Sequence, residues 1–435
     1  QLKKSPELHD KIEFEVAITT YSFDIDEKIE QLIGDTLNTT EKEEFKQAHL
    51  QQTIQLIKGE TKGSLSYALD KIEQLNKKQH TPSSLFAMVD DCIYLGTVPF
   101  SILARHGFIA KTLLISLKRR GIITQDELLQ ILSSVRTVAS ELLEDMNSLQ
   151  MGMLSTTNFM TKYGHLRPGT YDIMSHRYDQ MADLFSGATP HQPQREVKPF
   201  VFSQTQQQQI NSLLEDNGFV DFNIDDLLNY IREATVGREY GKFVFTRSVS
   251  DMLELIANFA EENGLGRDEI SNVPLNVIFN IAKNSCEISV EEQLREVSEQ
   301  EAEKHDISVG IRLPQLLNDQ AGVYIVPFQV SHPNYITQKK ITAPSILLRS
   351  EIDGVSLCDK IVVIEGADPG FDWIFSQKIA GLITKYGGAN SHMAIRCAEF
   401  GIPAAIGCGE QRFDQVLKAN KVHLDCAAGL INPLH

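Results

Sequence analysis

A glycine pair between an apolar run and a helical pattern limits what this chain can fold into more than any other feature. Ile379–Ile383 is an apolar run of strand length, and Gly387-Gly388 follows shortly after it. A helical pattern then begins near His392 and stops at Gly401, with a proline two residues further on. These signals predict a strand, a glycine turn and a helix with a histidine at or near its N-terminus.

This order of elements brings together the parts of a phosphoryl-binding site. Adjacent glycines allow positive φ and a close approach of the backbone to a ligand. The free N–H groups and the positive dipole end of a helix favour an anion. Imidazole is largely unprotonated near neutral pH and is then a nucleophile. His392 is therefore a candidate to take a phosphoryl group, and the alternative is a histidine that only caps a helix in an α/β domain.

The same stretch resembles a known family. Gly387-Gly388-Ala389-Asn390-Ser391-His392, followed nine residues later by Gly401-Ile402-Pro403-Ala404, resembles the phosphohistidine swivelling domain. That domain is shared by phosphoenolpyruvate (PEP) synthase, pyruvate phosphate dikinase, enzyme I of the phosphotransferase system and rifampicin phosphotransferase. The resemblance implies that His392 is the catalytic nucleophile and that Gly387, Gly388 and Ser391 contact the phosphate.

Two positions depart from the family pattern. Asn390 stands where the family usually has threonine, and Ala398 stands where it usually has arginine. Arg396 lies two positions before Ala398, so the role of an arginine in holding phosphate is open.

Size and composition narrow the class of protein. A chain of 435 residues predicts two or three domains. A net charge of −17 argues against nonspecific nucleic-acid binding and favours a soluble protein. Six scattered cysteines without a C-x-x-C pair are typical of reduced thiols in the cytosol. We see no apolar run long enough to span a membrane and no signal peptide, so we expect a cytoplasmic protein without nucleic-acid or membrane partners.

Residues 1–327 predict a mainly helical acceptor-binding or substrate-binding domain. We expect a strand at 12–18 and then one or two amphipathic helices over 40–78. Buried helices over 83–120 should be broken near Gly96 and Pro99, and a further helix should run from a Thr124 cap to about Met151. The remaining expected elements are helices over 223–262, 265–270, 274–283 and 290–305 and a strand-like Val323–Val326.

A linker and an α/β unit complete the expected organisation. Two prolines bound residues 328–344, which we interpret as a swivel linker. Short strands alternate with short helices over 345–435, and Asp368 is expected to cap the first of these helices. The predicted fold class is multidomain, with a mainly α-helical domain followed by a C-terminal α/β (β/β/α) phosphohistidine swivelling domain.

A polar turn gives one set of candidate site residues. Gly and Pro in Lys162–Asp172 force a turn that presents His165, Arg167 and Asp172 together. The alternative is a structural turn whose polar groups satisfy their own backbone. The segment also resembles the "YGHR-PG" element in the middle domain of rifampicin phosphotransferase-like proteins. That resemblance implies a substrate-pocket role, with His165 as a candidate general base.

A second set lies on the long helical block. Arg238, Glu239 and Lys242 fall near one helical face together with Arg232. Such spacing is more often a solvated charged face. The stretch resembles the middle-domain helix of the same family, which implies that these side chains line the transfer site and neutralise charge on the moving phosphoryl group.

Domain order decides between members of the family. Because the sequence ends within thirty residues of Gly407, we expect it to lack the barrel that follows the histidine domain in PEP synthase. The order of a helical domain and then a histidine domain resembles the last two domains of rifampicin phosphotransferase. No G-x-x-x-x-G-K-[ST] loop is present. Because the chain also begins at Gln1, we expect an ATP-grasp domain upstream or in a separate protein, with ATP and Mg²⁺ used by the intact protein and bound by no motif here.

The expected function is therefore stepwise phosphoryl transfer. His392 would take a phosphoryl group from ATP and carry it to a small-molecule acceptor, which the sequence does not identify. We expect no resident metal. Two alternatives remain open: a non-catalytic phosphocarrier or docking protein phosphorylated on His392 by a separate partner, and a degenerate enzyme that only binds a ligand.

Overall fold

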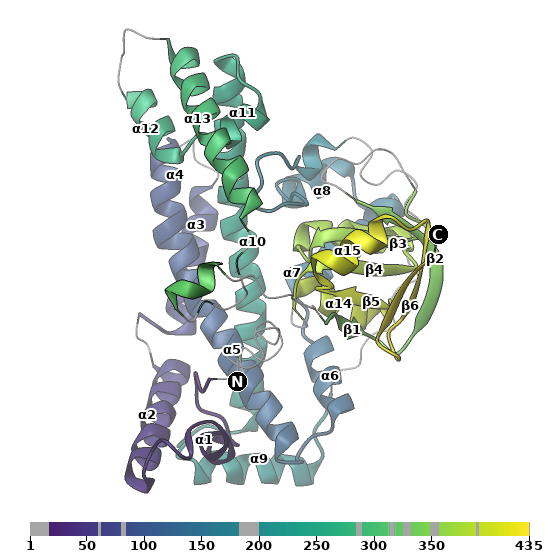
Figure 1. Cartoon of the computed structure of the whole chain (residues 1–435). Helices are drawn as coiled ribbons and strands as arrows, with labels where there is room; N and C mark the ends of the chain where they lie inside the picture. Colours follow the sequence, from purple (N-terminus) through teal and green to yellow (C-terminus); the bar gives the residue numbers. More distant parts are fainter. Residues whose placement is uncertain are drawn as a thin grey trace. The chain divides into compact units, whose positions relative to one another are not determined.

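The computed structural model describes residues 17–59, 62–79, 84–181, 200–283, 289–311, 313, 317, 319–324, 332–348, 356–388 and 391–434. The chain forms two compact units. The first comprises Gln1–Glu13, Asp145–His191 and Val249–His435, and the second comprises Phe14–Glu144 and Gln192–Ser248. A helical region is followed by a C-terminal mixed sheet, which confirms the expected fold class (Figure 1).

The second unit is helical. Its helices are α1 Ile25–Ile33, α2 Thr39–Lys58, α3 Leu65–Lys78, α4 Leu85–Asp91, the π-helical η2 Cys92–Thr97, α5 Val98–Arg119, α6 Gln125–Ser133 and α9 Gln204–Asp216; α7 Val138–Gln150 and α10 Ile224–Glu262 contribute residues to both units. The expected helices over 40–78 and 223–262 are confirmed. The expected strand at 12–18 falls mostly on residues outside the described part of the chain.

The helix after Ser84 is not broken as expected. Leu85–Asp91, Cys92–Thr97 and Val98–Arg119 run on as one helix, with a widened π-helical stretch around Gly96. Pro99 lies at the start of the α-helical part that follows this stretch, where a missing N–H costs little. Among the described residues, one helix, Leu85–Arg119, is long and apolar enough to cross a membrane. Core helices of soluble proteins also meet these criteria of length and composition.

The helix that starts at Thr124 is shorter than expected. The capping box is confirmed, because the Glu127 N–H donates to the Thr124 hydroxyl and the Thr124 N–H donates to the Glu127 carboxylate. However, α6 ends at Ser133, and the Ser134 hydroxyl donates to the carbonyl of Ile131. Serine competes in this way for backbone groups, so the helical periodicity resumes only in α7.

The first unit holds the remaining elements. They are α8 Thr156–Tyr163, η3 Tyr178–Gln180, α11 Arg267–Ser271, α12 Leu275–Lys283, α13 Val290–Gly310, η4 Gln320–Tyr324, β1 Asn334–Ile336, β2 Lys340–Leu347, β3 Ile361–Gly366, η5 Pro369–Gln377, β4 Gly381–Tyr386, α14 His392–Phe400, β5 Ala404–Ile406, α15 Gly409–Leu417, β6 Lys421–Asp425 and β7 Leu430–Leu434. The strand expected at 323–326 is wrong for Val323 and Tyr324, which lie in the 3-10 helix η4.

The C-terminal sheet has seven strands in the order β1-β5-β4-β3-β2-β6-β7. Strands β2, β3, β4 and β5 are parallel neighbours, whereas β1, β6 and β7 pair antiparallel. Inside the range expected as a linker, 328–344, β1 and the first residues of β2 already belong to this sheet. The boundaries 1–327 and 345–435 otherwise stay a prediction.

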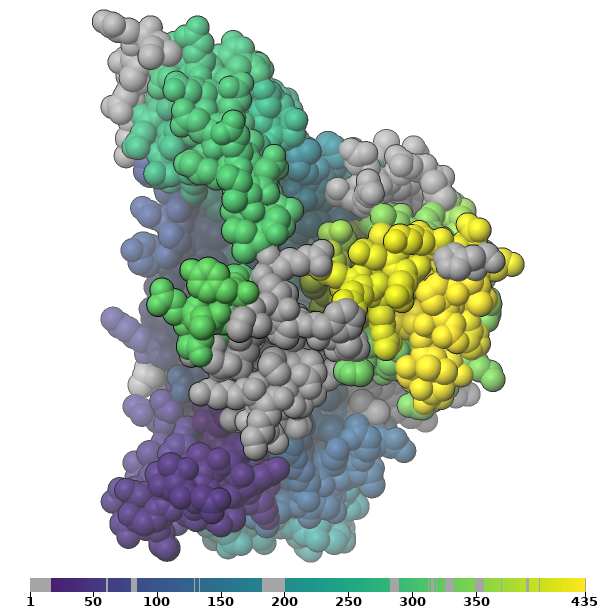
Figure 2. Space-filling model, viewed as in Figure 1, coloured from purple at the N-terminus to yellow at the C-terminus, as the bar shows by residue number. Residues whose placement is uncertain are grey.

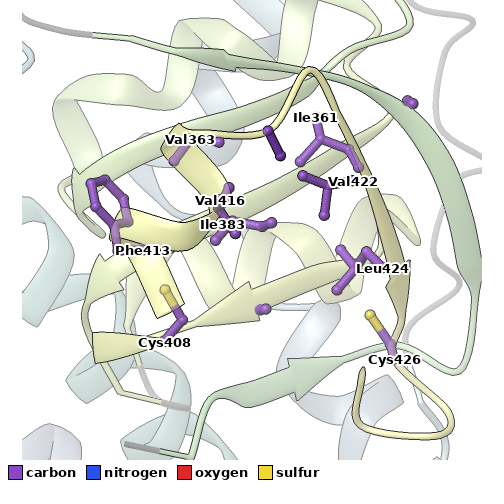
Figure 3. Packing of buried hydrophobic residues seen from close by; sticks show 12 residues of the cluster. Ile361, Val363, Ile383, Cys408, Phe413, Val416, Val422, Leu424 and Cys426 are labelled. Atoms are coloured by element: carbon purple, nitrogen blue, oxygen red, sulfur yellow. The ribbon is translucent and has the colours of Figure 1, made fainter. Parts of the chain in front are cut away.

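One face of this sheet packs under α15. Because side chains alternate along a strand, Ile361, Val363 and Ile383 point to the same face, where they meet Phe413 and Val416 of α15 (Figure 3). The other side of α15 carries the exposed polar residues Gln411, Asp414 and Gln415 and the exposed Leu417. Figure 2 shows the C-terminal residues in yellow. The sheet therefore has a dry core that fixes the positions of the strand ends.

The described cysteines are all free thiols, and four of them (Cys92, Cys397, Cys408, Cys426) are buried. Burial raises the pKa of Cys92 to about 11 and that of Cys408 to about 12, so both thiols stay protonated.

Candidate active site

The candidate site lies where parallel strands of the C-terminal sheet end. Strands β3, β4 and β5 run in the same direction, so their carboxyl ends meet at one edge. The connections that leave this edge are η5 after β3, the glycine turn after β4 and Gly407 after β5. The carboxyl edge of a parallel sheet is where α/β proteins commonly bind ligands.

The glycine turn is held against the end of β5. The N–H of Gly407 donates to the Thr384 hydroxyl (2.9 Å), and the N–H of Cys408 donates to the Thr384 carbonyl (2.8 Å). Gly387 has a φ of 127°, a backbone conformation that side chains rarely adopt, and a Cβ there would lie 2.8 Å from the Cβ of Ala367. The turn thus requires glycine at position 387; Ala389 and Asn390 lie outside the described residues.

The expected strand, turn and helix are confirmed, with His392 as the first residue of α14. The Ser391 hydroxyl caps the helix by accepting from the N–H of Ala394 (3.3 Å). The helix ends at Gly401, which has a φ of 62°. The imidazole therefore lies at the positive end of the helix dipole, which favours an anion there.

The ring of His392 is bound by a carboxylate that sequence reasoning missed. Its Nε2 atom lies 2.8 Å from Oδ1 and 2.7 Å from Oδ2 of Asp372 in η5. The Asp372 residue is only 2 % exposed, while 16 % of the His392 side chain is exposed. The one signal in the sequence is a lone acidic residue among the apolar Phe371, Trp373, Ile374 and Phe375.

Asp372 is positioned by contacts within η5 and with an earlier segment of the same unit. Asp368 caps η5, as expected, by accepting from the N–H of Gly370 (2.8 Å). The same carboxylate accepts from the Thr170 hydroxyl (2.7 Å). The Tyr178 hydroxyl donates to the carbonyl of Gly370 (2.6 Å), and a Cβ at Gly370 would collide with the carbonyl oxygen of Arg167. The turn Gly164–Tyr178 thus packs directly on η5.

Arg167 lies inside this turn, and its guanidinium is hydrogen-bonded on several sides. Its guanidinium donates to Glu254 (2.9 Å), to Ser250 and to the carbonyls of Asp172 and Ser175. Burial lowers the pKa of Arg167, and the charge of Glu254 opposes this. In this arrangement Arg167 holds the turn together, and its predicted contact with phosphate stays a prediction.

The other predicted residues are placed as follows. His165 is 4 % exposed, and its carbonyl accepts from the Ser250 hydroxyl. Arg238 and Glu239 form an ion pair (2.5 Å) with each other. Both residues and Lys242 lie on the part of α10 that belongs to the second unit. Their roles in catalysis and phosphate binding stay predictions. Arg396, one helical turn after His392, is buried.

In the part of the chain that the structure describes, no group of three or more His, Cys, Asp or Glu side chains is placed to hold a metal ion.

Residues 358–429 match the family model of the PEP-utilising enzyme mobile domain. The match covers β3 through α15 and β6, and it includes both His392 and Asp372. This part of the C-terminal region is thus similar to the mobile domain of PEP-utilising enzymes. No curated protein matches the chain.

Proposed function

We propose that His392 is the residue that becomes phosphorylated and that the protein moves a phosphoryl group from ATP to a small-molecule acceptor. The observation that carries this proposal is the place of His392: the first residue of a helix, at the carboxyl edge of a parallel sheet, in the domain that matches the PEP-utilising family.

The proposed reaction has two steps. His392 attacks the β-phosphorus of ATP, and AMP and phosphate are released as the phosphohistidine forms. The mobile domain then carries this group to the acceptor by a swing on the linker 328–344. Splitting one displacement into two keeps donor and acceptor apart. ATP would be bound by an ATP-grasp domain upstream or by a separate protein.

The acceptor site is proposed to involve the residues of the turn after α8 and of α10 that the resemblance indicated. His165 would act as general base, and Arg167, Arg238, Glu239 and Lys242 would bind the substrate or its phosphate. Arg238 and Lys242 would neutralise charge on the transferred group. Arg167 would have to release Glu254 to contact phosphate directly.

The test is labelling of the full-length protein. It is incubated with ATP labelled at the β-phosphorus, and we expect label that is lost in acid and stable in base, as a phosphohistidine requires. His392→Ala should abolish this label, and Ser391→Ala should only reduce it. Label retained by His392→Ala rules out the proposed nucleophile. Label that appears only when a second protein is added supports the carrier alternative.

A further inference from the structure

One face of the helix Leu85–Arg119, which comprises α4, η2 and α5, is exposed and rich in apolar side chains. Ile93, Tyr94 and Val98 are 41 %, 69 % and 50 % exposed. Exposed positions recur along the helix every three or four residues, as they do on one side of a helix. We call the following residues of this face the outer stripe: Asp90, Ile93, Tyr94, Thr97, Val98, Ser101, Ile102 and Arg105. A contiguous apolar surface of this kind commonly marks an interaction site.

The opposite face of the helix fixes it within the second unit. A Cβ at Gly96 would lie 2.9 Å from the Cβ of Phe245 in α10, so the two helices are in close contact there. Further along, the ring of His106 shares a 2.9 Å hydrogen bond with the hydroxyl of Tyr230, also in α10. These contacts leave the helix little freedom to rotate. The outer stripe is therefore preformed, and the helix cannot bury it by turning about its own axis.

A charged residue lies at each end of the outer stripe. Asp90 and Arg105 are both exposed, and neither forms an ion pair with any residue that the structure describes. The midpoint between them falls between Thr97 and Val98. At the rise of an α-helix, each charge lies roughly 11 Å from this midpoint along the axis.

Two such stripes are complementary when they pack antiparallel. If a two-fold axis passes through the midpoint, Asp90 of one copy lies opposite Arg105 of the other copy, and symmetry repeats the pair on the other side. Ile93 then lies opposite Ile102 of the other copy. A parallel arrangement would instead place each charge beside its own equivalent. The charge pattern thus favours one orientation.

We propose that the outer stripe binds the outer stripe of a second copy of this chain, so that the protein forms a two-fold symmetric, antiparallel dimer through the helix Leu85–Arg119. Near the axis the large Tyr94 faces the small Ser101 of the other copy, which leaves space for its ring. Opposite charges and side chains of complementary size therefore meet when the stripe pairs with itself. This dimer is independent of the phosphoryl transfer proposed for His392.

The strength of the dimer follows from its charge and size. The chain carries a net charge of −17, so two copies repel each other at long range and need a local pairing of opposite charges to associate. A contact between two helices lies at the low end of the sizes of specific interfaces. We therefore expect a dissociation constant of about 1–100 μM.

A membrane is the other occupant that the helix could have, because Leu85–Arg119 is long and apolar enough to cross one. However, Asp90 and Arg105 lie on the same face as the exposed apolar side chains. Burial of that face in hydrocarbon would carry both charges with it, at a high cost in free energy. The second copy neutralises the same two charges, so the observations favour the dimer.

Sedimentation velocity of the full chain tests the dimer. The average mass should rise from one copy toward two as the concentration increases over about 1–200 μM, the range around the expected dissociation constant. Salt at about 1 M should weaken the association several-fold, because it screens the two charge pairs. A protein that stays monomeric over the whole range overturns the proposal.

Exchange of charges identifies the interface. Asp90→Arg and Arg105→Asp should each weaken self-association about 10–100-fold, because two attractions become two repulsions. An equimolar mixture of the two variants should form dimers again, because each variant supplies the charge that the other lacks. Asp216→Arg, at an exposed aspartate of α9, is the control and should leave the association unchanged. Undiminished association in the single variants, or no recovery on mixing, overturns the proposal.

Val98→Glu tests the apolar centre of the stripe. It brings two carboxylates close to the axis, so we expect association to be lost, whereas Val220→Glu, at an exposed valine outside the stripe, should not change it. Thermal melting checks that both variants fold. Vesicles of phosphatidylcholine test the other occupant, and the natural protein should not sediment with them. Vesicle binding that is lost in Val98→Glu would assign the stripe to a membrane and overturn the proposal.

Discussion

The hydroxyl of Tyr178 donates a 2.6 Å hydrogen bond to the carbonyl of Gly370, a residue 192 positions further along the chain. Tyr178 is fully buried, and burial raises the pKa of its hydroxyl, so that the group stays a donor throughout the ordinary pH range. This contact joins the turn after α8 to the element that carries Asp372.

Removal of this hydroxyl should loosen η5. Tyr178→Phe leaves the buried carbonyl of Gly370 without its donor, and we expect a loss of about 1–3 kcal/mol in the free energy of unfolding. Hydrogen exchange of residues 369–377 should rise as well. Tyr324→Phe, at an exposed tyrosine, is the matched control and should change neither quantity. Equal exchange in the two variants would show that the bond does not hold η5.

The packing of Gly370 on the turn gives a second prediction. A Cβ at this position would overlap the carbonyl oxygen of Arg167 and would lie 2.9 Å from the Cα of Pro168. Gly370→Ala should therefore displace the turn, with faster hydrogen exchange over residues 164–178. Gly366→Ala has no atom within 4 Å of its new Cβ and serves as the control. The interpretation is wrong if both variants protect the turn equally.

The glycine turn beside His392 should be intolerant of a side chain. Gly387→Ala adds a Cβ to a residue with a φ of 127° and brings it 2.8 Å from that of Ala367. We expect the turn to shift by roughly an ångström and the rate of His392 phosphorylation to fall by up to about 100-fold. Gly121→Ala has a φ of 72° but open space around it, so it separates backbone strain from overlap. An unchanged phosphorylation rate in Gly387→Ala would exclude the turn from the site.

Glu254 should make the free energy of unfolding depend on pH. Burial alone would raise its pKa, but hydrogen bonds from Arg267 and Gln180 and the charges of Arg267 and Arg167 lower it to about 2 from an ordinary 4.5. The unfolded chain then binds more protons than the folded chain between these values. The contribution of Glu254 is complete above about pH 4.5 and is lost as the pH falls toward 2.

The corresponding variant is Glu254→Gln. Because it leaves two arginines without their partner, we expect a loss of about 3–5 kcal/mol at pH 7 in urea unfolding. The difference from the natural protein should shrink as the pH is lowered below 4.5. Glu262→Gln, at an exposed glutamate of the same helix, should show no such difference. A gap between the two curves that is constant with pH would contradict the assigned pKa.

Local sequence patterns predicted some parts of the fold. The glycine pair, the cap at Ser391 and the stop at Gly401 predicted β4, the turn and α14, because backbone sterics and capping act over a few residues. The capping box at Thr124 predicted the start of α6 for the same reason. The prediction that the helix breaks near Pro99 was wrong. Pro99 did not end its helix, because a π-helical stretch directly before it accommodates the proline.

Tertiary structure alone brought Asp372 to His392. The two residues are twenty positions apart and lie on elements that follow different strands, and only the parallel pairing of β3 with β4 brings those strand ends together. The pairing of Arg167 with Glu254 likewise depends on a contact across 87 positions. The sequence by itself determined that a histidine begins a helix after a glycine turn, because short-range backbone chemistry suffices for that. Which carboxylate holds its ring was decided by long-range packing, which a local pattern does not encode.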